Sequence, residues 1–124
     1  MGKYLAIGLG GCCGALLRYW ISGRVYAAFA GSDFPSGTLA VNLIGSFVLG
    51  LIAGLADHYI IHPNLRLFLT IGLLGAFTTF STFSYETVML MQVNSFYKAF
   101  LNVFVSVLVG LIAAFLGLLA GRGM

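Results

Sequence analysis

The residues best suited to chemistry in this chain lie together in one apolar segment, in the run from Gly75 to Glu86. This run reads Gly-Ala-Phe-Thr-Thr-Phe-Ser-Thr-Phe-Ser-Tyr-Glu, and it combines hydroxyl side chains, phenylalanine rings and one carboxylate. The hydrocarbon core of a bilayer gives such polar groups no water to bond with, so they are retained there for a partner, an ion or a wet path. We therefore expect function to be concentrated in this run.

A small anion is the ligand that these groups suit. Phe77, Phe80 and Phe83 recur at three-residue steps, which would place them on one face of a single helix, and Ser81 and Thr82 stand between them. The edge of an aromatic ring carries partial positive charge, and hydroxyls donate hydrogen bonds. Together they can replace the hydration of an anion without a fixed charge that would trap it. A stripe of rings that only packs helices together is the alternative.

Two asparagines add amide donors in other apolar segments. Asn42 lies early in the second segment, Asn102 lies early in the fourth, and Ser106 follows Asn102 by one helical turn. Each amide has two N–H donors, so Asn42 is a candidate ligand for the same ion, and Asn102 with Ser106 is a candidate polar track. The alternative for the asparagines is a hydrogen bond that holds two helices together, and for Ser106 a bond to its own helix backbone.

Two charged residues near the ends of apolar segments are candidates for the mouths of a pathway. Arg18 either extends to the lipid headgroups or attracts anions into a wet vestibule. Glu86 carries a negative charge that repels anions unless it is protonated or paired, so we expect it to line a vestibule or to pair with Arg18 or Lys98. No group of residues forms a catalytic constellation, and we therefore predict that the protein is not an enzyme.

The composition is that of an integral membrane protein. Of the 124 residues, 60% are hydrophobic and 7% are charged, against about 25% charged in soluble domains. The formal charge of +3 comes from scattered residues and argues against a nucleic-acid surface. Four apolar segments are long enough to cross a bilayer as helices, and short links make neighbours antiparallel. We predict one all-α, four-helix transmembrane domain over residues 1–124, with spans at about 4–21, 37–56, 65–91 and 96–120.

The third of these segments is too long for one straight span. As a continuous helix it would cover roughly 40 Å, whereas the hydrocarbon core is about 30 Å thick. Gly72 and Gly75 weaken the helix, and the threonines Thr78 and Thr79 can cap a helix that starts again. The sequence therefore predicts a third helix broken near Gly75–Thr79, and a break at this depth must be buried in protein or line a cavity.

The basic residues show no preference for one side of the membrane. With four spans, one side holds three of them and the other side holds three: Lys3, Arg66 and Arg122 against Arg18, Arg24 and Lys98. The positive-inside rule then gives no orientation, so the chain can insert both ways. Two oppositely oriented copies would form an antiparallel, dual-topology homodimer with a two-fold axis in the membrane plane. Small residues that recur along three of the segments also favour close packing of helices within and between subunits.

Three motifs make this chain resemble the CrcB/Fluc family of fluoride channels: GGCCGALLRY from Gly10, GTLAVNLIGSF from Gly37 and GLLGAFTTFSTF from Gly72. The resemblance implies an antiparallel homodimer in the bacterial inner membrane with two fluoride pathways. It implies that Phe80 and Phe83 of both subunits lie beside the ions. It also implies further pathway residues and two residues toward the vestibules, namely Asn42, Ser81, Thr82, Asn102 and Ser106 in the pathway, and Arg18 and Glu86 in the vestibules.

The resemblance further implies a structural sodium ion at the dimer centre, held by the backbone carbonyls of Gly75 and Thr78 from each subunit. Physical chemistry agrees, because a helix break leaves carbonyls unpaired and one buried cation can satisfy several of them. The expected function is a passive, highly selective fluoride channel that exports cytoplasmic fluoride. Two alternatives stay open: a small proton-coupled drug exporter formed by an antiparallel dimer, with Glu86 as its only candidate acid, and a membrane subunit that transports nothing.

Overall fold

The structure, a computed structural model, describes residues 1–124 and contains helices without any strand. The elements are α1 (Gly2–Ala28), α2 (Ser36–Ala56), α3 (Pro63–Leu67), the π-helix η1 (Phe68–Leu74), α4 (Gly75–Phe77), α5 (Phe80–Gln92) and α6 (Phe96–Gly123). Four stretches are long and apolar enough to cross a membrane: α1, α2, α6 and the combined stretch Pro63–Gln92. The predicted class, an all-α membrane protein with four spans, is confirmed.

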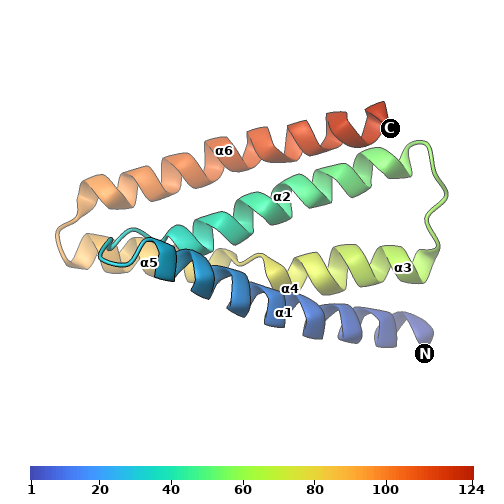
Figure 1. Ribbon diagram of the computed structural model, residues 1–124, viewed down its shortest axis with the longest axis horizontal. Coiled ribbons are helices and arrows are strands. Elements are labelled where there is room, and N and C mark those ends of the chain that lie inside the picture. The colour runs from blue at the N-terminus through green and yellow to red at the C-terminus, as the bar shows by residue number, and fades with distance from the viewer.

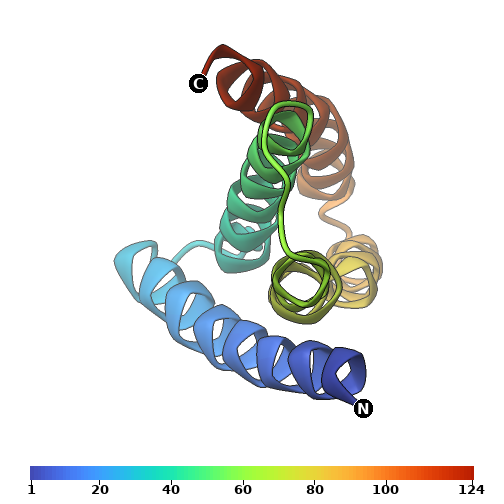
Figure 2. The ribbon, with the colours of Figure 1, turned by 90° about the vertical axis from the view of Figure 1, so that its right-hand side faces the viewer.

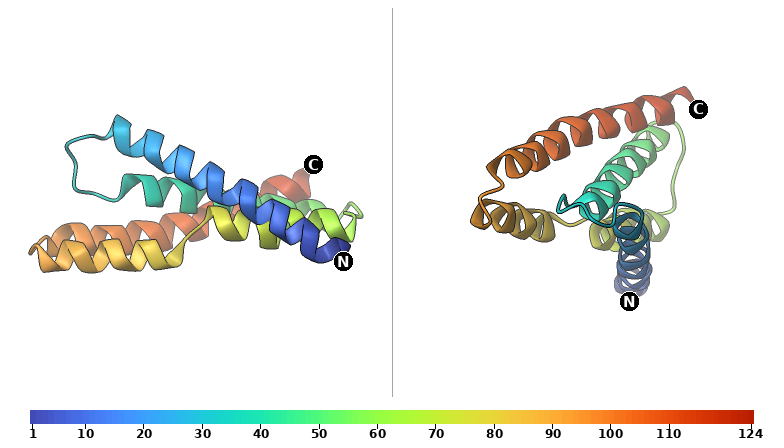
Figure 3. Two further views of the ribbon diagram at one scale, coloured as in Figure 1. Left: turned by 90° about the horizontal axis from the view of Figure 1, so that it is seen from below. Right: turned by 60° about the vertical axis from the view of Figure 1, so that its left-hand side comes forward.

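The four spans alternate in direction along the long axis of the molecule (Figure 1). Both chain termini and the connection between α2 and α3 lie at one end, and the connections from α1 to α2 and from α5 to α6 lie at the other. Helix α6 packs along α2, while α1 packs on the opposite side of the molecule against α3, η1 and α4 (Figure 2). Seen from below, α1 crosses the third span obliquely and diverges from α5 (Figure 3).

Helix α1 continues to Ala28, beyond the predicted apolar segment at 4–21. Hydropathy falls near Arg18 and Arg24, but a helix can continue past charged residues, and no proline interrupts the chain before Pro35. The guanidinium of Arg24 also lies 5.9 Å from the centroid of the Trp20 ring, one turn earlier, in a cation–π arrangement that a helix allows. The link to α2 is consequently shorter than the sequence suggested.

Glycines allow α2 and α6 to pack with their backbones in direct contact. A Cβ atom at Gly117 of α6 would overlap the carbonyl of Phe47, and one at Gly54 of α2 would overlap the carbonyl of Leu118. Such close approach is typical of helix pairs in lipid, where packing rather than water exclusion drives association. These contacts lie in the C-terminal half of α2, and the N-terminal half of the same helix carries Asn42 to the third span.

The third span is interrupted between α4 and α5, at two threonines with extended backbone. Thr78 has φ −86° and ψ 157°, and Thr79 has φ −151° and ψ 119°. The Thr79 side chain accepts a hydrogen bond from the Thr82 N–H (3.2 Å), so it caps the restarted helix α5. The predicted break near Gly75–Thr79 is confirmed, although Gly72 and Gly75 keep helical backbone and only the threonines leave it.

Candidate ion pathway

Asn42 pairs with the backbone of Thr79 at the break. The Thr79 N–H donates to Oδ1 of Asn42 (2.8 Å), and Nδ2 of Asn42 donates to the Thr79 carbonyl (3.0 Å). The amide thus supplies both partners that an extended residue between two helices lacks. One of the two N–H groups on Nδ2 has no partner in the chain, and it is a donor directly beside the break.

The break leaves several backbone carbonyls without hydrogen-bond donors, among them those of Gly75 and Thr78. In a continuous helix the Gly75 carbonyl would accept from the Thr79 N–H, which here donates to Asn42. The Thr78 carbonyl would accept from the Thr82 N–H, which here donates to the Thr79 hydroxyl. No other group of the chain donates to either carbonyl. Gly75 and Thr78 are the two residues for which the resemblance implies a sodium ion.

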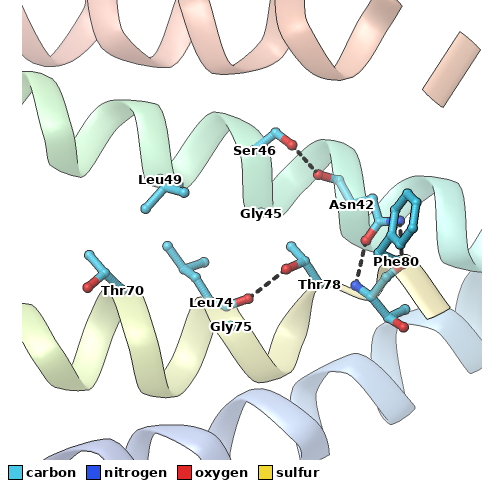
Figure 4. Close-up of a pocket in the computed structure, with 10 residues that line it drawn as sticks. Asn42, Gly45, Ser46, Leu49, Thr70, Leu74, Gly75, Thr78 and Phe80 are labelled. Atoms are coloured by element: carbon cyan, nitrogen blue, oxygen red, sulfur yellow. Dashed lines mark hydrogen bonds between the residues drawn. The ribbon is translucent and has the colours of Figure 1, made fainter. Parts of the chain in front are cut away.

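A cavity of about 300 Å³, the break cavity, lies between α2 and the third span (Figure 4). Its lining includes Asn42, Gly75, Thr78 and Phe80. The cavity is therefore bordered by an amide side chain, two residues whose carbonyls lack donors, and a phenylalanine. The Phe80 side chain is 79% exposed in the protomer. Its ring centroid lies 5.7 Å from that of Phe83, with the planes tilted by 45°. The two phenylalanines therefore form a pair at the start of α5.

Phe77, the first phenylalanine of the motif, has a different role. Phe77 lies before the break, is only 4% exposed and packs in the core with Val41. The extended backbone of the two threonines separates Phe77 from Phe80, so the three rings do not share one helix face. The prediction of a single stripe is wrong for Phe77, because it assumed an unbroken helix.

A second cavity, the middle cavity, has a volume of about 240 Å³ and shares Thr79 with the break cavity. Arg18, Thr82 and Glu86 line it, so the two predicted vestibule residues and one predicted pathway residue lie together. The cavity combines a guanidinium, hydroxyls and a carboxylate. This arrangement places positive charge close to the break without any cation in the break cavity itself.

Glu86 is held by hydroxyl groups rather than by a basic residue. Its Oε1 accepts hydrogen bonds from the Tyr26 hydroxyl (2.6 Å) and from the Thr38 hydroxyl (2.9 Å). Neither Arg18 nor Lys98 forms an ion pair with it, and Lys98 pairs instead with a carboxylate of the α1–α2 connection (3.2 Å). Of the two alternatives for Glu86, pairing with Arg18 or Lys98 is therefore not found, and Glu86 lines the middle cavity instead.

The polar residues of α6 lie apart from both cavities in the protomer. Asn102 is 1% exposed, and its Nδ2 donates to the Thr87 hydroxyl of α5 (2.9 Å), so it joins two helices. The Ser106 hydroxyl lies 3.5 Å from Oδ1 of Asn102. Ser81 and Phe83 also line neither cavity, although the Ser81 hydroxyl lies 3.5 Å from that of the capping threonine. Their place in a pathway stays a prediction.

Sequence reasoning missed Tyr26 and Thr38, which lie beside the middle cavity and hold Glu86. Tyr26 was assigned to a link because it follows the apolar segment. A signal was present: Arg18, Ser22 and Tyr26 recur at four-residue steps, which a longer helix would align on one face.

The fold and the site define a small multi-pass helical membrane protein whose third span breaks beside polar cavities. The chain belongs to the family described as "CrcB-like protein, Camphor Resistance (CrcB)", whose sequence model matches residues 5–118. The family that the motifs resemble is thereby confirmed.

Individual relatives match over nearly their full lengths. The chain is 50% identical to a protein named fluoride-specific ion channel FluC from Hydrogenovibrio crunogenus, with 97% of this chain and 91% of the relative covered. It is also 50% identical to the proteins of that name from Geobacter sulfurreducens, with 98% of both chains covered, and from Magnetococcus marinus, with 94% of both covered.

Proposed function

We propose that this protein is a passive, highly selective fluoride channel that exports cytoplasmic fluoride across the bacterial inner membrane. The observation that carries the proposal is the break cavity, where Phe80 and the unpartnered amide N–H of Asn42 meet at an interruption of a transmembrane helix. The names of relatives about 50% identical over nearly the whole chain support fluoride as the ion. The proposed activity is ion conduction without catalysis.

The chemistry of the break cavity fits an ion that must bind and leave again. Fluoride is small and strongly hydrated, so a pathway must offer donors in place of water. Neutral donors and ring edges stabilise the ion without the deep well that a lysine or arginine would create. Arg18 lines the neighbouring middle cavity, where a positive charge raises the local concentration of anions. Larger halides fit such a site less well, which is the basis proposed for selectivity.

We propose that the working unit is an antiparallel homodimer. Phe80 borders the break cavity but is 79% exposed in a single protomer, so the cavity lacks cover on the side of this ring. The equal distribution of basic residues between the two ends of the bundle allows both orientations. A second copy would supply the missing cover and a second set of rings.

We also propose a structural sodium ion at the carbonyls of Gly75 and Thr78. These carbonyls have no donor in the chain. The proposed dimer would bury them at its centre, and buried carbonyls of native proteins rarely stay unpaired. Oxygen ligands are those that hard cations prefer, and a pair of carbonyls from each subunit would form one site at the dimer centre. When bound, the cation would compensate these dipoles and join the two breaks. We assign it a structural role and no part in fluoride transfer.

The test is fluoride efflux from liposomes that contain the purified protein, with a fluoride electrode outside and a potassium ionophore to dissipate the voltage. We expect fluoride efflux far faster than chloride efflux. Replacement of Phe80 or Phe83 by isoleucine removes a ring edge from the site, and we expect at least a tenfold loss, on the order of 1.4 kcal/mol. Phe29→Ile, at an exposed ring after α1, is the matched control and should conduct normally. Absent fluoride efflux, or equal chloride efflux, would refute the proposal.

A further inference from the structure

A third cavity, the outer cavity, has a volume of about 620 Å³ and lies at the end of the bundle that holds the α1–α2 connection. Asp33 and Pro35 of this connection line it together with residues of α5. It shares Tyr26 and Glu86 with the middle cavity, and the middle cavity shares Thr79 with the break cavity. The three cavities therefore follow one another from the helix break to the end of the molecule.

The wall between the middle and outer cavities is built by three helices. Tyr26 comes from α1, Thr38 from α2 and Glu86 from α5. The hydroxyls of Tyr26 and Thr38 both donate to Oε1 of Glu86 (2.6 Å and 2.9 Å), and the two hydroxyl oxygens lie 3.0 Å apart. Gly37 makes room for this arrangement, because a Cβ atom at this position would overlap the Tyr26 ring. The wall is thus a specific construction in which the ring, the small residue and the carboxylate depend on one another.

The two oxygens of the Glu86 carboxylate differ sharply. Both hydroxyl bonds go to Oε1, whereas Oε2 is buried and has no hydrogen-bond partner. Hydrogen bonds to a charged acceptor are short and strong, and they draw negative charge toward the donors. The hydroxyls of Tyr26 and Thr38 therefore fix the carboxylate in one position and reduce the field that an approaching anion meets. Without them a carboxylate between the two cavities would repel fluoride.

We propose that Tyr26 and Thr38 are positioning residues for ion passage, whose hydroxyls hold and partly neutralise the Glu86 carboxylate in the wall between the middle and outer cavities. This inference rests on the proposed function, because it concerns how an anion passes Glu86. It assigns a role to the tyrosine at the end of α1 that is separate from ring contacts with the ion at Phe80 and Phe83. It also explains why a carboxylate is compatible with an anion pathway.

A double-mutant cycle in the liposome efflux assay tests the proposal. Tyr26→Phe keeps the ring that packs over Gly37 and removes only the hydroxyl. We expect it to slow fluoride efflux about tenfold when Glu86 is present, from the usual strength of a hydrogen bond to a charged group. In a Glu86→Gln background there is no negative charge to neutralise, and the same substitution should change efflux less than about twofold.

Thr38 gives a second, independent arm of the test. Thr38→Val removes the other hydroxyl and should slow fluoride efflux. Thr38→Ser keeps the hydroxyl and should conduct fluoride at a rate close to that of the wild type. Tyr59→Phe is the matched control, because it also removes a hydrogen-bonded hydroxyl, to the Met124 carbonyl (3.2 Å), at the opposite end of the bundle. Thermal unfolding in detergent checks that the variants stay folded.

The outcomes separate this inference from the proposed function. If the wild type conducts fluoride and Tyr26→Phe is equally slow with Glu86 and with glutamine, the hydroxyl acts only through packing, and the inference is overturned. Wild-type efflux by Tyr26→Phe overturns it as well. If the wild type itself carries no fluoride, the proposed function is wrong and the inference falls with it. Should Tyr26→Phe fail to fold, the comparison of Thr38→Val with Thr38→Ser decides.

Discussion

Asn42 shows at the scale of one residue why an amide is required beside the helix break. It accepts from the N–H of Thr79 and donates to the carbonyl of the same residue. A serine could not reach both groups in this way, and an aspartate would offer no donor to the carbonyl. The same side chain retains a free N–H for the break cavity. Asn42 can therefore both join two helices by a hydrogen bond and act as an ion ligand, because each role uses a different N–H group of its amide.

We predict that Asn42→Leu destabilises the protein strongly. The substitution leaves the buried N–H and carbonyl of Thr79 without partners, at a cost of about 1–3 kcal/mol for each group. The free energy of unfolding in mixed detergent micelles measures the effect. Ser46→Ala is the control, since the Ser46 hydroxyl lines the same cavity but bonds only the Asn42 carbonyl of its own helix (2.7 Å). Equal stability of the two variants would show that Thr79 does not depend on the amide.

At the scale of the elements, hydropathy and breaker residues predict much of the architecture. The four spans follow from apolar length, and the break follows from excess length together with glycine and threonine. The capping role of a threonine is confirmed in Thr79. The end of α1 was missed because hydropathy reports where a helix leaves the hydrocarbon core, whereas the helix itself continues to Ala28. The seven-residue π-helix η1 has no signal in the sequence that we can identify.

The candidate site was predictable in its residue types but not in its pairings. Asn42 was identified as an amide donor in an apolar segment, and the family resemblance implied Gly75 and Thr78; the structure places all three at one cavity. The bonds from Tyr26 and Thr38 to Glu86 join positions 60 and 48 residues apart, and no local pattern reports such contacts. Phe77 was misplaced for the related reason that a period of three has meaning only within one continuous helix.

The unpaired carbonyls of the broken third span lead to a prediction about sodium. We expect the melting temperature of the purified protein to fall when sodium is replaced by N-methylglucamine, which is too large for a carbonyl site, at constant chloride and ionic strength. A cation at 100 times its Kd stabilises a protein by about 2.7 kcal/mol, so the shift should be several degrees. Addition of sodium should restore stability with saturation. Identical melting curves in both salts would contradict a structural sodium ion at Gly75 and Thr78.

At the scale of the whole molecule, the charges of the two ends balance closely. Each end has one ion pair between a connection and α6, Lys98 with Asp33 (3.2 Å) and Arg122 with Asp57 (2.7 Å). The remaining basic residues are Lys3 and Arg66 at one end and Arg18 and Arg24 toward the other. A few basic residues near the span ends decide the orientation of such a protein in the membrane. Because they are balanced here, we expect this chain to insert in the two orientations about equally.

Dual topology can therefore be tested by changing that balance. Gly123→Lys with Met124→Lys adds basic charge at the end that holds both termini, and Ala28→Lys with Ala30→Lys adds it at the other end, all at exposed positions. Each pair should drive insertion in one direction only, so that an antiparallel dimer does not form and fluoride resistance of a sensitive host is lost. Co-expression of the two variants supplies both orientations and should restore resistance. Reporter fusions at the C-terminus measure the orientation of each variant. Full resistance from a single variant fixed in one orientation would show that the protein works without an inverted partner.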